Sequence, residues 1–79
     1  MRVSTDMEDI GFRAETDIEN RGAILAIYLD GVKQEYVVTA DSDEGIIIRL
    51  KRYPDGAFVV SGDEIVRETL NGDVRIETI

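Results

Sequence analysis

Turn sequences that contain glycine divide this chain into short segments, and this regular division constrains the fold more than any other feature. The intervals between successive turn glycines run from about 6 to 14 residues. The segments between them are rich in Ile, Val, Tyr, Thr and Phe, which favour strands. Turn signals at this spacing are typical of an antiparallel β protein. The turn sequences are Asp30-Gly31, Glu44-Gly45, Pro54-Asp55-Gly56, Ser61-Gly62-Asp63 and Asn71-Gly72.

We therefore expect a mainly β fold in a single small domain over residues 1–79. A chain of 79 residues has room for one domain with a modest core. The successive hairpins predict a small antiparallel sheet that folds into a two-layer sandwich or a partly open barrel, with at most one or two short helical turns.

The Asp30-Gly31 pair gives the most specific local prediction. Asp-Gly supplies the two positive φ values of a type I′ turn, whose twist matches that of the flanking strands. Gly31 is therefore expected at positive φ in a two-residue hairpin. The predicted cross-strand partners are Leu29 with Val32, Ile27 with Gln34, Leu25 with Tyr36, and Ala23 with Val38.

The Asn71-Gly72 pair predicts a second hairpin of the same kind, with Gly72 at positive φ. Its register places Glu68 opposite Arg75, which would be a favourable pair of opposite charges. A short helix over residues 63–70 is the alternative, but the β-branched residues of that segment favour a strand.

Between these two turns, residues 46–53 predict a strand with alternating faces. The preceding loop, residues 41–45, is expected to turn the chain with Gly45 in the left-handed conformation. Pro54-Asp55-Gly56 predicts a tight turn, followed by a short strand over residues 57–60. The faces set by the Asp30-Gly31 register predict a shared core. The predicted core residues are Leu25, Ile27, Tyr36, Val38, Ile46, Ile48 and Leu50.

The opposite face of these strands is also half apolar. A lone antiparallel sheet normally has one polar face. Either other strands of the chain fold over this second face, or a partner or another copy of the chain covers it. The candidate apolar interface residues are Ile24, Ala26, Tyr28, Val37 and Ile47.

The N-terminal third gives less specific signals. Alternation over residues 10–15 predicts a strand. The sequence from Thr16 to Glu19 has the spacing of a capping box, so a single helical turn closed by Gly22 is expected there. Residues 1–9 are expected to form either a frayed tail or an edge strand.

The net charge limits the classes of partner that the chain can bind. Seventeen carboxylates against nine Lys and Arg give a net charge of −8. Such a chain repels phosphate backbones, so direct nucleic-acid binding is disfavoured. The acids either keep the protein soluble or face a partner with a basic surface, as in an acidic mimic that inhibits a nucleic-acid-binding protein. The candidate acidic surface is Asp6, Glu8, Asp9, Glu15, Asp17 and Glu19.

The residue inventory argues against catalysis. With no histidine and no cysteine, the usual general base, zinc ligands and thiol nucleophile are missing. The acidic loop from Asp41 to Gly45 fails the EF-hand pattern because its glycine falls one position early. We therefore expect no enzyme, no cofactor, no metal and no small-molecule substrate. Arg49, Lys51 and Arg52 are the one basic cluster, which indicates either a small anion site or cross-strand charge pairs.

The amino-acid composition also predicts the cellular compartment. The absence of cysteine indicates the cytoplasm, and no apolar segment approaches the roughly 20 residues of a membrane helix. We therefore expect no membrane partner.

Several of the turn and strand residues also resemble small phage and prophage proteins of unknown function. The residues that carry the resemblance are Leu29-Asp30-Gly31, Val38-Thr39-Ala40-Asp41, Glu44-Gly45, Arg49, Gly56, Glu68, Gly72, Val74 and Ile76. The resemblance covers about two thirds of the chain. It implies a phage origin and a place in the host cytoplasm, and it assigns no activity and no site residues.

Two function classes remain from the sequence. One is a small non-catalytic accessory protein that binds another protein. The other is a structural or assembly module that associates with itself through a sheet face or edge.

Overall fold

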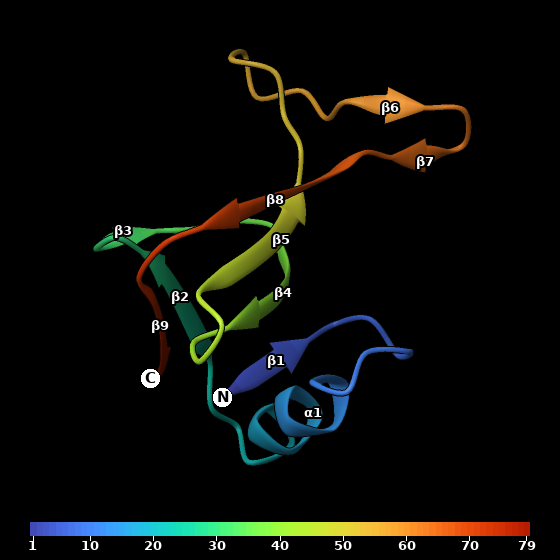
Figure 1. The fold of residues 1–79 in the computed structure, drawn as a ribbon. Coiled ribbons are helices and arrows are strands. Elements are labelled where there is room, and N and C mark those ends of the chain that lie inside the picture. The colour runs from blue at the N-terminus through green and yellow to red at the C-terminus, as the bar shows by residue number, and fades with distance from the viewer.

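The computed structural model describes residues 1–79 as one helix and nine short strands (Figure 1). The strands form a four-stranded antiparallel sheet in the order β1-β4-β5-β8, a three-stranded sheet in the order β3-β2-β9, and the two-stranded β6-β7. The mainly β prediction is confirmed, and no sheet closes into a barrel. The elements are β1 (Arg2–Ser4), α1 (Phe12–Asn20), β2 (Leu25–Leu29), β3 (Val32–Lys33), β4 (Val37–Asp41), β5 (Ile46–Leu50), β6 (Val60–Ser61), β7 (Glu64–Ile65), β8 (Arg67–Asn71) and β9 (Val74–Thr78).

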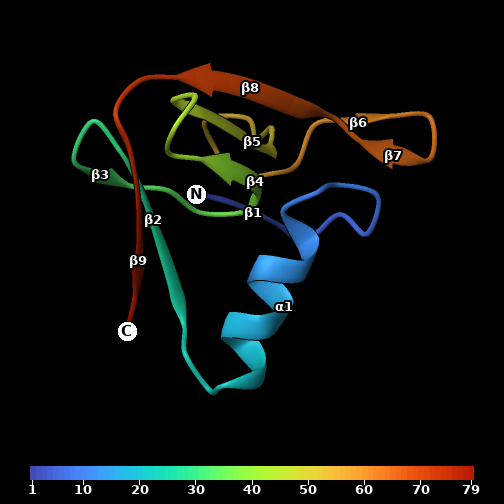
Figure 2. The ribbon, with the colours of Figure 1, turned by 60° about the horizontal axis from the view of Figure 1, so that its bottom comes forward.

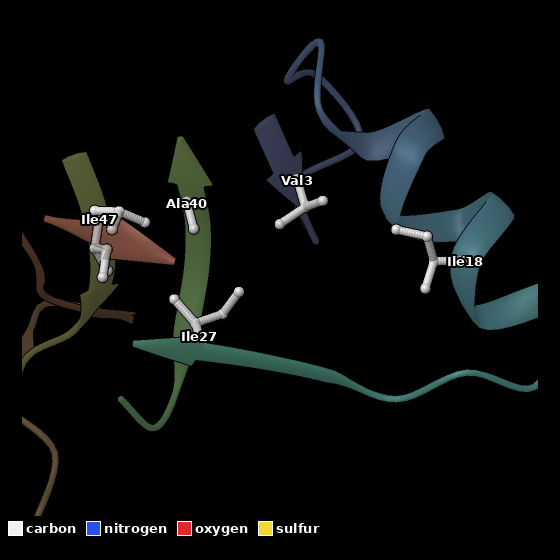
Figure 3. Close-up of a cluster of buried hydrophobic side chains, with 6 residues drawn as sticks. Val3, Ile18, Ile27, Ala40 and Ile47 are labelled. Atoms are coloured by element: carbon white, nitrogen blue, oxygen red, sulfur yellow. The ribbon is translucent and has the colours of Figure 1, made fainter. Parts of the chain in front are cut away.

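One hydrophobic cluster joins the two larger sheets and the helix. Strands β2 and β9 cross the direction of β4, β5 and β8, and α1 lies beside β1 and β2 (Figure 2). Figure 3 shows five of the buried side chains converging from different elements. The cluster consists of Val3, Ile18, Ile27, Ala40, Ile47 and Val74. The predicted second layer is therefore supplied by strands of the same chain.

The core residue of β5 differs from the prediction. Ile47 is fully buried, whereas Ile46, Ile48 and Leu50 are only half-buried. The alternation along the strand was identified correctly, but the wrong face was assigned to the core. The reason is that β4 and β5 do not share a sheet with β2, so the hairpin register could not orient them.

The Asp30-Gly31 hairpin is confirmed at its turn and as far as Ile27 and Gln34, and the register predicted beyond these residues is wrong. Asp30 and Gly31 have φ values of 50° and 83°, and Leu29 lies opposite Val32. The pairing continues through Tyr28 and Lys33 to a backbone hydrogen bond of 2.8 Å from the Gln34 N–H to the Ile27 carbonyl, and it ends there. The predicted partnerships of Leu25 with Tyr36 and of Ala23 with Val38 do not form. The chain instead leaves the sheet, with a positive φ of 57° at Tyr36.

Because the hairpin ends early, the positions predicted for Tyr36, Val38 and Ala23 change. Tyr36 lies in the connection between β3 and β4 and is 51% exposed, so its assignment to the core was wrong. Val38 is buried as predicted, but it belongs to the other sheet. Its predicted partner Ala23 precedes β2 and packs half-buried against the core cluster.

The second predicted hairpin does not form. Strand β8 pairs with β5 and strand β9 pairs with β2, so the chain turns a corner from one sheet to the other. Gly72 does not have positive φ; it is needed for space, because a Cβ there would lie 2.8 Å from the Asp30 carboxylate oxygens. That carboxylate accepts a hydrogen bond from the Asp73 backbone N–H at 2.9 Å. Glu68 therefore meets Arg49 at 2.7 Å instead of Arg75.

The strand predicted over residues 10–15 is wrong, because α1 begins at Phe12. Its end agrees with the sequence. Gly22 has a φ of 77°, and its N–H donates to the Glu19 carbonyl while that of Ala23 donates to the Ile18 carbonyl. This pair of hydrogen bonds is a Schellman motif. The helix is therefore longer than the single turn expected from Thr16 to Glu19, and it begins four residues earlier, at Phe12.

Residues 2–4 form the edge strand that was one of the two expectations for the N-terminus. Arg2 clamps the connection to the helix, with hydrogen bonds from Nε and Nη2 to the two Asp9 carboxylate oxygens at 2.9 and 2.7 Å. Its Nη1 also reaches Asp41 at 3.4 Å. The guanidinium of Arg2 and the N–H of Gly11 lower the pKa of Asp9 to about 2. A bidentate pair of this kind fixes geometry as well as charge.

Ile47→Ala tests the face of β5 that forms the core. We expect it to lower the free energy of unfolding by about 2–5 kcal/mol, because it opens a cavity at the centre of the cluster. Ile48→Ala is the matched control and should cost roughly half as much or less, because Ile48 is already half-exposed. Urea denaturation measures both, and equal losses would contradict the assigned face.

Asp9→Asn tests the Arg2 clamp. Because the folded-state pKa of Asp9 lies below its ordinary value of 3.8, the clamp stabilises the fold above that value and is lost as the pH falls toward about 2. The variant should be less stable than the parent at pH 7 and should lose less stability between pH 5 and pH 2. Thermal unfolding across this range measures the difference, and parallel pH profiles would refute it.

Candidate functional site

The candidate apolar interface does not form one exposed surface. Ala26 and Ile47 are buried in the body of the fold, so they are core residues and offer no surface to a partner. Tyr28 and Val37 are half-buried. Ile24 alone is well exposed, at 67%. The apolar second face is therefore mostly covered from within the chain.

The candidate acidic residues are also divided. Asp9 is held by Arg2, and Asp6 lies 3.5 Å from Arg67. The remaining acids are Glu8 in the loop before α1 and Glu15, Asp17 and Glu19 on the helix. Ion pairs therefore weaken the continuous negative surface that a nucleic-acid mimic would present.

The basic cluster is largely occupied by cross-strand contacts. Arg49 donates from Nε to Glu68 and from Nη1 to Gln34, both at 2.7 Å. Arg52 lies over the Tyr36 ring, 4.7 Å from its centroid, and 3.8 Å from the Glu35 carboxylate. Of the two interpretations of this cluster, charge pairing describes these two arginines.

A projecting segment is the most distinctive feature of the surface. Residues 51–66, here called the arm, leave the end of β5, turn twice and return to β8, standing away from the rest of the protein, here called the body (Figure 1). The first turn is the predicted one, with a hydrogen bond from the Gly56 N–H to the Tyr53 carbonyl. The second is the two-residue Gly62-Asp63 turn between β6 and β7. The strand predicted over residues 57–60 shrinks to a bridge at Phe58 and the start of β6.

Aromatic and cationic contacts hold the base of the arm on the body. The rings of Tyr36 and Phe58 meet edge to face with centroids 5.1 Å apart. Arg52 stacks on the same tyrosine ring. Backbone hydrogen bonds also join the three passes of the chain at this base: the Val59 N–H donates to the Lys51 carbonyl, and the Val66 N–H donates to the Val59 carbonyl. The arm is therefore attached to the body at its base, and its β6-β7 hairpin projects outward (Figure 1).

Apolar side chains on the arm face solvent. Tyr53 is 55% exposed and Val60 is 60% exposed, and Ile65 is exposed as well. Val60 and Ile65 are cross-strand partners in the β6-β7 hairpin. Exposed apolar groups that gather on one projecting element mark an interaction surface more often than isolated ones do.

An open strand edge runs from the arm into the body. No strand lies beyond β8 in its sheet, and β8 continues the direction of β7 along the chain. On the β5 side, the Val66 carbonyl accepts a hydrogen bond from the Lys51 N–H, and the Gly72 N–H donates to the Gly45 carbonyl. By the alternation of an antiparallel ladder, the N–H and C=O groups of Arg67, Thr69 and Asn71 point outward. We call residues 64–71 the open edge.

A hollow of about 860 Å³ lies where the arm leaves the body, beside the first part of the open edge. Its walls include Leu50 from β5, Ile65 from β7, Arg67 at the start of β8, and Val66 between these last two strands. An added strand that reached this end of the edge could place a side chain in the hollow, because alternate side chains of a strand point to the same face.

A second concavity, here called the groove, lies between α1 and β2. It measures about 460 Å³, and most of its lining residues are apolar. Glu15 and Glu19 line the helix wall and Lys33 lines the opposite wall. Partial burial, with a smaller effect from Glu19, raises the pKa of Glu15.

The sequence did not reveal the arm, the open edge or the groove. Two turn signals only six residues apart, at Gly56 and Gly62, were the available indication of the arm. Strands that short cannot reach across a sheet, so they are expected outside the core. The groove brings together residues of five separate elements and has no local signal.

Comparison with known proteins gives no family: no protein-family model, no curated protein and no solved structure matches the chain. The resemblance to phage proteins therefore stays a prediction. The one helix is nine residues long, well short of what a bilayer crossing requires. No three acidic side chains gather in an arrangement suited to a metal ion.

Glu15→Gln tests the environment of the groove. Because the folded-state pKa of Glu15 is raised, its contribution to stability is present at low pH and is lost as the pH rises through that pKa. The glutamine variant should therefore gain stability relative to the parent as the pH rises from 4 to 7. Melting temperatures across this range measure the difference, and a glutamine variant that is less stable at pH 7 would be inconsistent with it.

Proposed function

We propose that this protein is a small non-catalytic module that binds another protein through its open edge and arm. The partner adds an extended strand alongside β8, and its neighbouring apolar side chains contact Val60 and Ile65 on the arm. The observation that carries the proposal is the continuity of the open edge with an exposed apolar surface.

The mode of binding follows from the chemistry of an open strand. Unpaired N–H and C=O groups at a sheet edge pair with an incoming strand, and pockets beside the edge select its side chains. The outward groups of Arg67, Thr69 and Asn71 supply the first element of this mode. The hollow beside Ile65 and Val66 supplies the second.

The net charge of the chain favours a partner with a basic surface. At −8 the protein attracts positive charge, and long-range attraction of this kind speeds association. Glu64 lies at the start of the open edge and Asp63 in the adjoining turn. A strand with lysine or arginine near the end that meets the arm would complement these carboxylates.

Self-association through the same edge is the second candidate function. Two antiparallel copies of β8 centred on Thr69 would place Arg67 opposite Asn71, so no like charges would meet across the new ladder. Against it stands the net charge of each copy, since two chains of −8 repel one another. Sedimentation velocity separates the two candidates: a monomer at micromolar concentration favours a different partner, and a dimer favours the assembly module.

Thr69→Pro tests the open edge. Proline removes an outward N–H without touching the hydrogen bonds to β5, and edge strands tolerate it at such positions. Thr78→Pro is the matched control, because Thr78 holds the equivalent outward position on the edge strand β9. Both variants should keep the circular dichroism spectrum of the parent.

The expected result is seen by affinity capture from a lysate of the source cells, with each variant as bait. A protein captured by the parent and by Thr78→Pro should be lost with Thr69→Pro and with the double variant Val60→Ser/Ile65→Ser. Equal capture by the parent and all three variants would contradict the proposal.

A further inference from the structure

The groove between α1 and β2 carries an inference that does not depend on the proposed function, since it shares no residue with the arm or the open edge. Residues 23–27 supply most of its apolar lining, here called the floor, and Val37 and the exposed ring of Tyr36 line it as well. Figure 2 shows the backbones of α1 and β2, which are joined by a short connection and both supply lining residues. A volume of about 460 Å³ lies within the range of small-molecule sites, which are apolar with a few polar groups.

The charges of the groove select the ligand. Glu15 and Glu19 lie four residues apart on α1, so both carboxylates occur on one face of the helix. Neither carboxylate belongs to any of the protein's ion pairs or side-chain hydrogen bonds, in contrast to Asp9 and Glu68. No basic residue lies in the last turn of the helix, whose carbonyl end is itself partly negative.

Neither glutamate is neutralised by an ion pair, although Arg21 is the C-cap residue of α1. Lys33 lines the facing wall but makes no ion pair with either glutamate. Two like charges at this spacing destabilise a helix, and the partial burial of Glu15 adds to that cost. A positive charge placed between the helix and the strand would relieve both effects.

We propose that the groove binds a small amphipathic cation, a protonated amine carried on a compact aliphatic or aromatic body. The apolar body lies on the floor formed by residues 23–27, against Val37. The ammonium group donates hydrogen bonds to Glu15 and lies near Glu19, at the helix wall. Lys33 opposes a second positive charge, so a monocation is preferred to a dication.

Nuclear magnetic resonance titration of the full chain tests this inference with four probes at pH 7: hexylamine, hexanol, hexanoate and ethylamine. Hexylamine should shift the amide signals of residues 23–27 and 34–37 in a saturable way. Hexanol and ethylamine should bind more weakly, because each has half of the required chemistry, and hexanoate should bind least.

Variants decide which group makes the contact. Glu15→Gln should weaken hexylamine binding about tenfold, the usual effect of losing a charged hydrogen-bond partner. Glu44→Gln removes an exposed carboxylate in a different loop and should leave the affinity unchanged. Lys33→Gln should leave it equal or tighter.

Three results would overturn the site. Hexanol binding as tightly as hexylamine would show a merely apolar docking surface. Shifts spread over the acidic surface, or equal weakening by Glu15→Gln and Glu44→Gln, would show non-specific attraction to a chain of −8. The absence of saturable hexylamine binding would show that the groove takes no such ligand.

Discussion

Six side chains from six different elements meet in one small cluster, and each of these elements depends on the others to keep it closed. Val3, Ile18, Ile27, Ala40, Ile47 and Val74 come from β1, α1, β2, β4, β5 and β9. A chain of this length buries too little apolar surface to support a second core. The two sheets must therefore face each other across this cluster, and the helix must close its end.

The limited core also explains the arm. Strand β8 contributes no residue to the cluster, and residues 51–66 extend beyond the reach of its side chains. Their apolar side chains are thus left in solvent, supported only through Tyr36, Phe58 and Arg52 at the base. The same geometry leaves the outer side of β8 without a neighbouring strand. The surface proposed for partner binding is therefore a direct consequence of where the core ends.

Most of the partly buried charged side chains are paired within the chain, and Glu15 is an exception. Arg2 binds Asp9 and Asp41, and Arg49 binds Glu68 and Gln34, so these groups are satisfied within the chain. Glu15 is different, because it is partly buried beside an apolar groove without a partner. Residues that break local rules at a cost to stability are expected at functional sites more often than elsewhere. This contrast separates the groove from the rest of the acidic surface.

The sequence by itself determined the class of fold, the local turns at Asp30-Gly31 and Pro54–Gly56, the turn at Gly45, whose φ is 67°, and the end of the helix at Gly22. Each of these depends on residues adjacent in the chain, through φ preferences and short-range hydrogen bonds. Only the tertiary structure decided that Ile47 faces the core, that Gly72 turns a corner and that Phe12 begins a helix. Strand pairing is set by the burial of distant side chains against one another, and a one-residue change of register exchanges the two faces of a strand. The open edge and the groove exist only once those pairings are chosen, because each is built from segments far apart in the sequence.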